Sequence, residues 1–309
     1  MKRIGRTVIF NGAALLNNER IKESMKKPYI KVFSYGKFVP AAQSLRAEKE
    51  TRYYMGKKGN VAIITGASSG MGREFAIQIA QFYPSIQEFW IIARRKERLE
   101  ELQEKLLGRR VKILALDLGR QEDIDALKQT LEEEKPHVRI LVNAAGFGMI
   151  GKVGKMKEKD CTGMVDINCR ALTAVTHIVL PYITKKGQII QMASSAAFMP
   201  QPGFAVYAAS KSYVLSFSRA LGCELKERDI SVTAVCPGPV KTEFFDIAET
   251  YEAVRLYKKL TMAKADKVVY QALVDAKHGR SVSVYGPLMK GFRVLAKFLP
   301  ADFMMMFVH

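Results

Sequence analysis

The sequence predicts a single α/β domain: a doubly wound, mostly parallel sheet of about seven strands with helices on both faces. Two patterns over residues 59–285 predict this class. Short apolar runs recur without polar alternation, which is typical of strands buried on both faces. Segments with the apolar spacing of a helix separate these runs, and alternation of this kind builds a parallel sheet.

The elements follow one another along the chain. The expected strands are Val61–Ile64, Phe89–Ala93, Val111–Leu116, Ile140–Val142, Ile189–Met192, Val232–Val235 and Val282–Tyr285. The expected helices are Glu74–Phe82, Lys96–Leu107, Glu122–Glu133, Thr162–Ile183, Ala205–Leu225 and Lys264–Ala276.

A basic extension, residues 1–58, precedes this domain. It holds fourteen Lys and Arg against four Glu, so it contributes +10 to the chain's net charge of +19. We expect either a solvated basic arm that packs partly on the domain or an organelle-targeting peptide. Basic extensions suit anionic membranes and nucleic acids, but no known nucleic-acid-binding module is present, so nucleic acid is the less expected partner.

The first expected strand runs into a turn with glycines at positions 66, 70 and 72. Glycines at this spacing permit a tight turn, close approach of the backbone to a pyrophosphate and close packing of the next helix. The start of that helix offers free N–H groups to phosphates. The pattern therefore predicts a dinucleotide site.

The second expected strand ends at Ala93 and is followed by Arg94 and Arg95, where NAD-binding domains usually place an acidic residue. Guanidinium groups there bind a 2′-phosphate through forked hydrogen bonds. NADP(H) is therefore favoured over NAD(H). The alternative is that both arginines belong to a solvated charge run that continues through Arg98.

Tyr207 and Lys211 lie four residues apart in an expected helix, so they share one face. An ammonium beside a phenol favours the phenolate, and Ser194, thirteen residues upstream, could hold a carbonyl oxygen against the phenol. The three residues together predict a general-acid site for a carbonyl. Taken alone, the Tyr–Lys pair also fits a solvated polar pair.

Several ordered motifs then resemble the classical short-chain dehydrogenase/reductase family over residues 59–285. Besides the glycine turn, they are Asp117-Leu118, Asn143–Gly146 (with Ala144 in place of a second Asn) and Pro237–Thr242. The family's catalytic tetrad matches Asn168, Ser194 (Ser195 as fallback), Tyr207 and Lys211. The expected cofactor-binding residues are Thr65, Gly66, Ser68, Ser69, Gly70, Met71, Gly72, Arg94, Arg95, Asp117, Leu118, Asn143, Ala144, Ala145, Gly146, Tyr207, Lys211, Pro237, Gly238, Val240 and Thr242.

The resemblance implies a Rossmann-type fold and hydride transfer between a nicotinamide and a carbonyl or alcohol. In that mechanism Tyr207 supplies the proton, Ser194 orients the carbonyl, Lys211 lowers the pKa of Tyr207, and Asn168 positions a water. It also implies a homodimer through the helices at 162–183 and 205–226. The competing hypothesis is a peripheral membrane or scaffold protein that binds the dinucleotide as a structural or sensing ligand.

The substrate is expected to be an apolar ketone or acyl compound, because apolar residues flank the expected site. They are Phe198, Met199, Pro200, Phe204, Pro239, Phe244 and Phe245. The segment Lys241–Thr261 is expected to form a lid that carries Phe244, Tyr251 and Leu256.

The tail, residues 286–309, predicts a basic amphipathic helix. Leu288, Phe292, Leu295 and Leu299 recur at helical spacing, with Lys290, Arg293 and Lys297 on another face. Pro300 is expected to end this helix, before the apolar residues 303–307. Such a helix either lies in a membrane interface, or docks on its own domain near the substrate mouth or on a second subunit.

Neither a metal site nor a disulfide framework is expected. The four cysteines, Cys161, Cys169, Cys223 and Cys236, show no Cys-x-x-Cys pair and no His at zinc-ligand spacing. Free thiols indicate a reducing compartment, and no charge-free apolar run reaches the length of a membrane span. The expected location is cytoplasmic, with membrane association through the tail left open.

Overall fold

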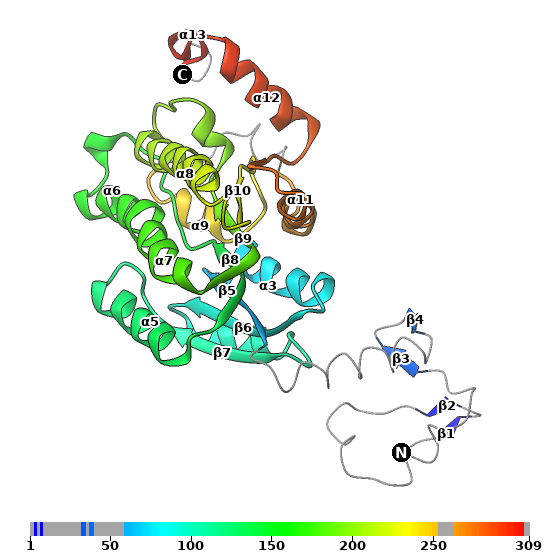
Figure 1. The fold of residues 1–309 in the computed structure, drawn as a ribbon. Helices are drawn as coiled ribbons and strands as arrows, with labels where there is room; N and C mark the ends of the chain where they lie inside the picture. Colours follow the sequence, from blue (N-terminus) through cyan, green and yellow to red (C-terminus); the bar gives the residue numbers. More distant parts are fainter. Residues whose placement is uncertain are drawn as a thin grey trace. The chain divides into compact units, whose positions relative to one another are not determined.

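The computed structural model describes residues 59–252 and 262–305, and four short strands within residues 1–58 (Figure 1). The chain divides into two compact units, Met1–Lys58 and Gly59–His309. In the first unit, β1 (Arg3–Ile4) pairs antiparallel with β2 (Thr7–Val8), and β3 (Val32–Ser34) with β4 (Lys37–Val39). The predicted arm or targeting peptide otherwise lies outside the described residues.

The second unit contains a parallel sheet of seven strands in the order β11-β10-β9-β8-β5-β6-β7. The doubly wound fold predicted from the sequence is thereby confirmed. The strands are β5 (Asn60–Thr65), β6 (Ile86–Ala93), β7 (Arg110–Ala115), β8 (His137–Asn143), β9 (Ile183–Met192), β10 (Ser231–Val235) and β11 (Val282–Ser283).

Helices connect the strands. The α-helices are α3 (Gly70–Phe82), α4 (Lys96–Gln103), α5 (Gln121–Glu134), α6 (Glu158–Val165), α7 (Leu172–Val179), α8 (Ala205–Glu224), α9 (Phe244–Ala248), α11 (Ala265–Lys277), α12 (Pro287–Phe298) and α13 (Ala301–Met305). Shorter helical segments are η1 (Val153–Lys155), η2 (Asp166–Ala171), η3 (Leu180–Tyr182) and η4 (Ser195–Phe198).

The predicted helix Thr162–Ile183 differs most from the structure. It is divided into α6, the π-helical η2, α7 and the 3₁₀ turn η3, and its last residue, Ile183, is the first residue of β9. Apolar spacing cannot show a π-helical turn, because the extra residue per turn depends on side chains that pack around it.

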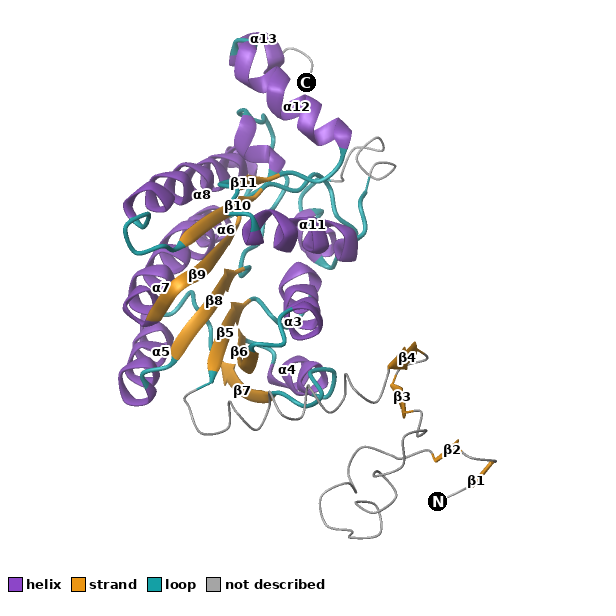
Figure 2. Cartoon of the chain, turned by 45° about the vertical axis from the view of Figure 1, so that its right-hand side comes forward, coloured by secondary structure: helices purple, strands orange, loops and turns teal. Residues whose placement is uncertain are grey.

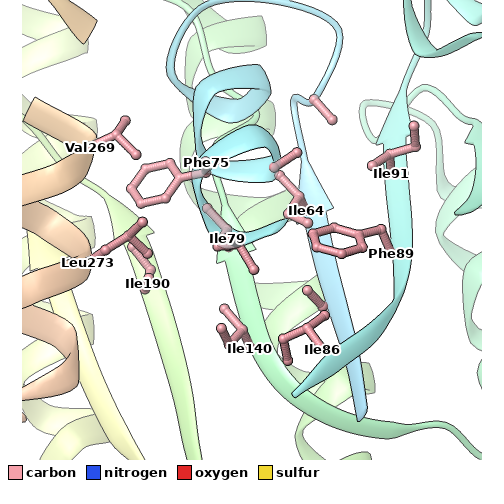
Figure 3. Packing of buried hydrophobic residues seen from close by; sticks show 14 of the residues in the cluster. Ile64, Phe75, Ile79, Ile86, Phe89, Ile91, Ile140, Ile190, Val269 and Leu273 are labelled. Atoms are coloured by element: carbon pink, nitrogen blue, oxygen red, sulfur yellow. The ribbon is translucent and has the colours of Figure 1, made fainter. Parts of the chain in front are cut away.

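Helices cover both faces of the sheet, as Figure 2 shows, with α3, α4 and α11 on one side and α5, α7 and α8 on the other. On the first side, Phe75 and Ile79 of α3 pack between Ile64 of β5 and Leu273 of α11 (Figure 3). All four side chains are buried. Covering both faces explains why the central strands read as unbroken apolar runs.

The order of the strands fixes where a ligand can bind. From β5 the chain proceeds outward through β6 and β7, then returns to pair β8 with the other edge of β5. Connections that leave in opposite directions open a crevice at the carboxyl ends of β5 and β8, where doubly wound folds bind their ligands. Among the described residues, no helix is long and apolar enough to cross a membrane.

Candidate active site

The glycine turn lies at the carboxyl end of β5. Gly66 has a φ of +67°, and a Cβ there would approach the backbone carbon of Ala144 to 2.7 Å. A Cβ on Gly72 would lie 2.3 Å from the Gly66 carbonyl oxygen. Both positions therefore require glycine: a side chain at Gly66 would force the turn away from the loop that follows β8, and one at Gly72 would force α3 away from the turn.

The start of α3 fits an anionic ligand. Ser69 caps the helix without a side-chain hydrogen bond, and the first turn contains no acidic residue. The first N–H groups of α3 are thus left to a ligand, and the positive end of the helix dipole favours a phosphate. The turn and this helix end together fit the pyrophosphate of a dinucleotide.

Arg94 and Arg95 are both exposed at the rim of this crevice. The guanidinium of Arg95 donates a hydrogen bond to Ser68 Oγ at 3.3 Å and to a carboxylate oxygen of Glu243 at 2.9 Å. Arg98 approaches the same carboxylate at 3.9 Å. The hydrogen bond from Arg95 lowers the pKa of Glu243, so this carboxylate is an anion beside the cations predicted to bind a 2′-phosphate.

Tyr207 is enclosed in an aromatic pocket at the start of α8. Its ring stacks on Phe204 at 4.3 Å between centroids and lies 5.5 Å from Phe244 of α9. Only 7% of the residue is exposed, and its hydroxyl lies near that of Ser194. Ser194 Oγ also accepts a hydrogen bond from the Ala196 N–H at 3.1 Å, which fixes the serine at the start of η4.

Lys211 lies one turn beyond Tyr207, as the spacing predicts. Its ammonium lies 5.6 Å from the centroid of the Tyr207 ring and donates a hydrogen bond to the Met192 carbonyl at 2.7 Å. Asn168, in the π-helical segment η2, donates to the Phe147 carbonyl at 2.9 Å and to Ser210 Oγ at 3.0 Å. Asn168 therefore ties the loop after β8 to α8, beside Lys211.

Burial controls the protonation of this pair. It raises the pKa of Tyr207 to about 12, with the Ser194 hydrogen bond opposing the rise, and it lowers the pKa of Lys211 to about 8. The resemblance implies that Lys211 lowers the pKa of Tyr207, but Lys211 is not among the groups that shift it here. Desolvation exceeds that attraction because both groups are buried and each favours its neutral form.

The depressed pKa of Lys211 predicts a dependence of stability on pH. Above about pH 8 folded Lys211 loses its proton, whereas an unfolded lysine keeps it until about pH 10.5. The unfolded state then binds more protons, so the free energy of unfolding rises with pH in this window. From pH 8 to 9.5 we expect wild type to gain about 1–2 kcal/mol relative to Lys211→Met in urea unfolding.

Lys128→Met is the control, because Lys128 is an exposed lysine on α5. Its pH dependence should match that of wild type. Equal pH slopes for wild type and Lys211→Met would show that Lys211 keeps its ordinary pKa in the folded protein.

These groups meet in one cavity of about 590 Å³ at the carboxyl ends of the strands. Most of the expected cofactor and catalytic residues line it, and three do not: Thr65, Asn143 and Asn168. Thr65 Oγ1 accepts hydrogen bonds from the N–H groups of Ala144 and Ala145, both at 3.1 Å. The buried Asn143 amide donates to Thr176 and Gln191. All three residues thus hold neighbouring elements together behind the cavity wall.

The other half of the cavity has apolar walls. Of the residues expected to border a substrate, Met199, Phe204, Pro239, Phe244 and Phe245 line this cavity. Phe198 and Pro200 line an adjacent cavity instead. Tyr251, expected in the lid, donates a hydrogen bond to Asp160 of α6 at 2.5 Å, and Leu256 lies outside the described residues.

Sequence analysis missed part of the cavity wall. Leu288, Met289 and Phe292 come from α12, and a Cβ on Gly238 would meet Met289 Sδ at 2.7 Å. Phe147, Ile150, Gln201 and Glu243 were also not expected. Docking of the tail near the substrate mouth was one of the alternatives that the sequence left open, and the structure shows which residues of the tail make that contact.

Comparison with known proteins agrees with this geometry. Residues 60–252 match the family model described as short chain dehydrogenase. A sulfoacetaldehyde reductase of Chromohalobacter salexigens is 36% identical over 216 residues, which cover 67% of this chain and 84% of that protein.

Two solved structures are similar to this chain. One is a short-chain dehydrogenase from Sphingobium yanoikuyae in complex with NADPH, with a TM-score of 0.67 and 27% identity over 78% of this chain and 96% of that one. The other is a 3-ketoacyl-(acyl-carrier-protein) reductase from Brucella melitensis complexed with NADH, with a TM-score of 0.62 and 25% identity over 74% of this chain and 96% of that one. This chain therefore belongs to the short-chain dehydrogenase/reductase family, whose members are NAD(P)-dependent oxidoreductases that act on alcohol and carbonyl groups.

Proposed function

We propose that this protein is an NADPH-dependent reductase of an apolar ketone or acyl-type carbonyl, able to run in reverse as an alcohol dehydrogenase. The observation that supports it best is the buried Tyr207 phenol beside Ser194 and Lys211, in a cavity whose substrate end is apolar. The bound cofactor supplies the hydride. The protein contributes the geometry and the proton.

Each of the four residues of the tetrad has its own role in the proposed reaction. Tyr207, with a pKa of about 12, keeps its proton at neutral pH and donates it to the carbonyl oxygen as negative charge develops there. Ser194 lies beside that phenol and orients the same oxygen. Lys211 is a proton source one helical turn away, and its lowered pKa of about 8 makes proton release easy near neutral pH. Asn168 positions the loop that closes over this group.

We propose an apolar substrate because of the residues that line the substrate end of the cavity. Arg94, Arg95 and Lys211 are the basic residues among the described residues that line the cavity. The two arginines lie at the cofactor turn and Lys211 lies beneath Tyr207. A sulfonate, as the name of the Chromohalobacter relative implies for that protein, meets no cation among the described residues that line the substrate end. An aliphatic or aromatic ketone fits the walls formed by Met199, Phe204 and Phe292.

The direct experiment is oxidation of NADPH by the purified protein with aromatic, steroid and long-chain aliphatic ketones. We expect turnover with apolar ketones and little with charged aldehydes of similar size. Failure of the protein to bind either nicotinamide cofactor would contradict the proposal.

The preference for NADPH rests on Arg94 and Arg95, and Glu243 makes it testable. The Glu243 carboxylate is ion-paired with Arg95, so a 2′-phosphate must compete with this carboxylate for the guanidinium. Glu243→Gln should therefore strengthen NADPH binding by about threefold or more, because like charge beside the phosphate is removed, and leave NADH binding nearly unchanged. Fluorescence titration of both cofactors measures this difference.

Glu100→Gln is the control for that substitution. It removes the same charge from α4, where Glu100 pairs with Lys96 on the exposed surface. Equal strengthening of NADPH and NADH by Glu243→Gln would show that Glu243 does not face the 2′-phosphate.

We also propose a homodimer through the helical segments at 162–183 and 205–226. In its support, Val165 and Tyr213 are exposed apolar side chains on α6 and α8, and Tyr213 is hydrogen-bonded to Thr173 of α7. Sedimentation velocity would give twice the monomer mass.

The free cysteines agree with a cytoplasmic location.

A second candidate function is a peripheral membrane or scaffold protein that binds a dinucleotide without turnover. The exposed apolar side chains of α12 favour it. Activity separates the two candidates, since a scaffold oxidises no NADPH with any ketone and is indifferent to removal of the Tyr207 hydroxyl.

A further inference from the structure

The tail helix α12 presents three rows of side chains at helical spacing. Met289, Phe292, Ala296 and Leu299 are half-buried and form the row that faces the domain. Lys290, Arg293 and Lys297 form an exposed basic row. Leu288, Gly291, Leu295 and Phe298 form a third row, which is apolar and exposed. The sequence placed Leu288 and Leu295 with Phe292 and Leu299, whereas the structure turns the first pair toward solvent.

The inner row attaches α12 to the catalytic cavity. The ring of Phe292 lies 6.1 Å from that of Phe198 in η4, and Met289 lies against Gly238. Met289 and Phe292 both line the cavity beside Tyr207. In Figure 2, α12 lies beyond β10 and β11, at the top of the view. The first turns of α12 therefore form part of the roof of the substrate site.

The outer apolar row finds no cover among the described residues. Leu288 is 63% exposed, Leu295 48% and Phe298 73%, and no residue of α12 is fully buried. In α13, Phe303 continues the exposed apolar surface. Exposed leucine and phenylalanine side chains at neighbouring positions mark a surface that is buried against something else.

The adjacent basic row indicates what covers it. An amphipathic helix with Leu and Phe on one face and Lys and Arg beside them lies in the interface of an anionic membrane. A second copy of the chain is a poorer occupant. A twofold contact on α12 would bring Lys290 and Lys297 toward the same cations of the partner, on a chain whose net charge is +19.

Leu288 connects the two surfaces. It belongs to the exposed row and also lines the catalytic cavity. A second cavity, of about 450 Å³, lies under Met305 of α13 and shares Met199 and Gln201 with the first. The apolar surface thus continues from the outer row of α12 into the substrate site.

We propose that α12 rests on an anionic membrane and admits apolar carbonyl substrates from the lipid into the catalytic cavity past Leu288. The proposal that α12 binds a membrane rests only on the three rows of side chains on α12. The passage of substrate rests on the proposed function, because it requires an apolar carbonyl compound as the substrate.

The first test is co-sedimentation of the full chain with vesicles of phosphatidylcholine, with and without about one third phosphatidylglycerol. Residues 1–58 carry +10 and bind anionic vesicles by charge alone, so the comparison is between variants. Leu295→Ser/Phe298→Ser should weaken binding to the mixed vesicles at least about tenfold, because it removes apolar area that enters the interface. Lys290→Gln/Lys297→Gln should weaken it by about the same factor.

The matched control is Leu107→Ser/Val153→Ser, which removes two equally exposed apolar side chains from loop and η1 positions outside the tail. This control should bind vesicles as wild type does. Binding by Leu295→Ser/Phe298→Ser that equals that of the control would overturn the membrane surface. Conversion of a wild-type oligomer into a smaller species by that variant, with vesicle binding unchanged, would assign the row to a second copy instead.

The second test compares two ketones in the presence of mixed vesicles and NADPH. Turnover of 2-undecanone, which partitions into the lipid, should fall about tenfold in Leu295→Ser/Phe298→Ser. Turnover of water-soluble acetophenone should stay unchanged, since neither residue lines the cavity. Equal loss for both ketones would overturn delivery from the membrane. If the protein turns over no ketone, the proposed function is contradicted. The vesicle result then tests by itself whether α12 binds a membrane.

Discussion

Tyr207→Phe should lower kcat for NADPH-dependent ketone reduction by about 10²–10⁴, the usual share of a general acid. The substitution removes the hydroxyl that lies near Ser194 and leaves the ring stacked on Phe204. Dissociation constants for NADPH should change little, because the ring still fills the same space. Steady-state kinetics and fluorescence titration on the same preparation measure both quantities.

Tyr270→Phe is the matched control. Tyr270 is an exposed tyrosine of α11 whose ring packs edge-on against Phe82, on the opposite face of the sheet from α8. It should retain wild-type kcat and stability. If Tyr207→Phe keeps the wild-type rate with a ketone that the wild type reduces, the proton comes from another group and the proposed mechanism is wrong.

Gly66→Ala should abolish cofactor binding and destabilise the fold by more than about 3 kcal/mol. Two costs add. The φ of +67° disfavours any L-residue with a side chain by about 1–2 kcal/mol. In addition, the new Cβ would lie 2.7 Å from backbone atoms of Ala144 and Ala145, so the β5 turn and the loop after β8 must separate. Urea unfolding and NADPH titration provide the measurement.

Gly108→Ala separates the two costs. Gly108 has a φ of +75°, but no atom lies within 4 Å of its Cβ position. We therefore expect a loss of only about 1–2 kcal/mol and unchanged NADPH binding. A Gly66→Ala protein as stable as Gly108→Ala would show that the loop after β8 yields to the new methyl group.

Much of the fold follows from local patterns. The strand at Val61–Ile64 and the helix that follows are determined by apolar runs and by glycines whose geometry has few alternatives. Tyr207 and Lys211 were placed on one face by a spacing of four residues, because every α-helix brings such residues together. The resemblance to a known family added Asn168 and favoured Ser194 over Ser195, and the roles of both residues stay predictions.

Other features depend on which distant segments meet. The π-helical turn that holds Asn168 inside the fold follows from its hydrogen bonds to Phe147 and Ser210. Gly148 reads as an ordinary loop glycine, yet a Cβ there would lie 2.4 Å from the Tyr207 ring. Desolvation of Tyr207 and Lys211 likewise comes from the whole cavity, so their pKa values could not be read from a four-residue spacing.

By itself the sequence determined the class of fold, the dinucleotide turn and the helix that carries Tyr207 and Lys211, because each depends on residues close together in the chain. Only the tertiary structure decided that Glu243 holds Arg95 and that Met289 and Phe292 of the tail roof the cavity. These contacts join segments far apart in the chain: Arg95 and Glu243 are 148 residues apart, and Met289 and Gly238 are 51 residues apart (289 − 238). No local periodicity encodes such a meeting, since the packing of the intervening sheet brings the segments together.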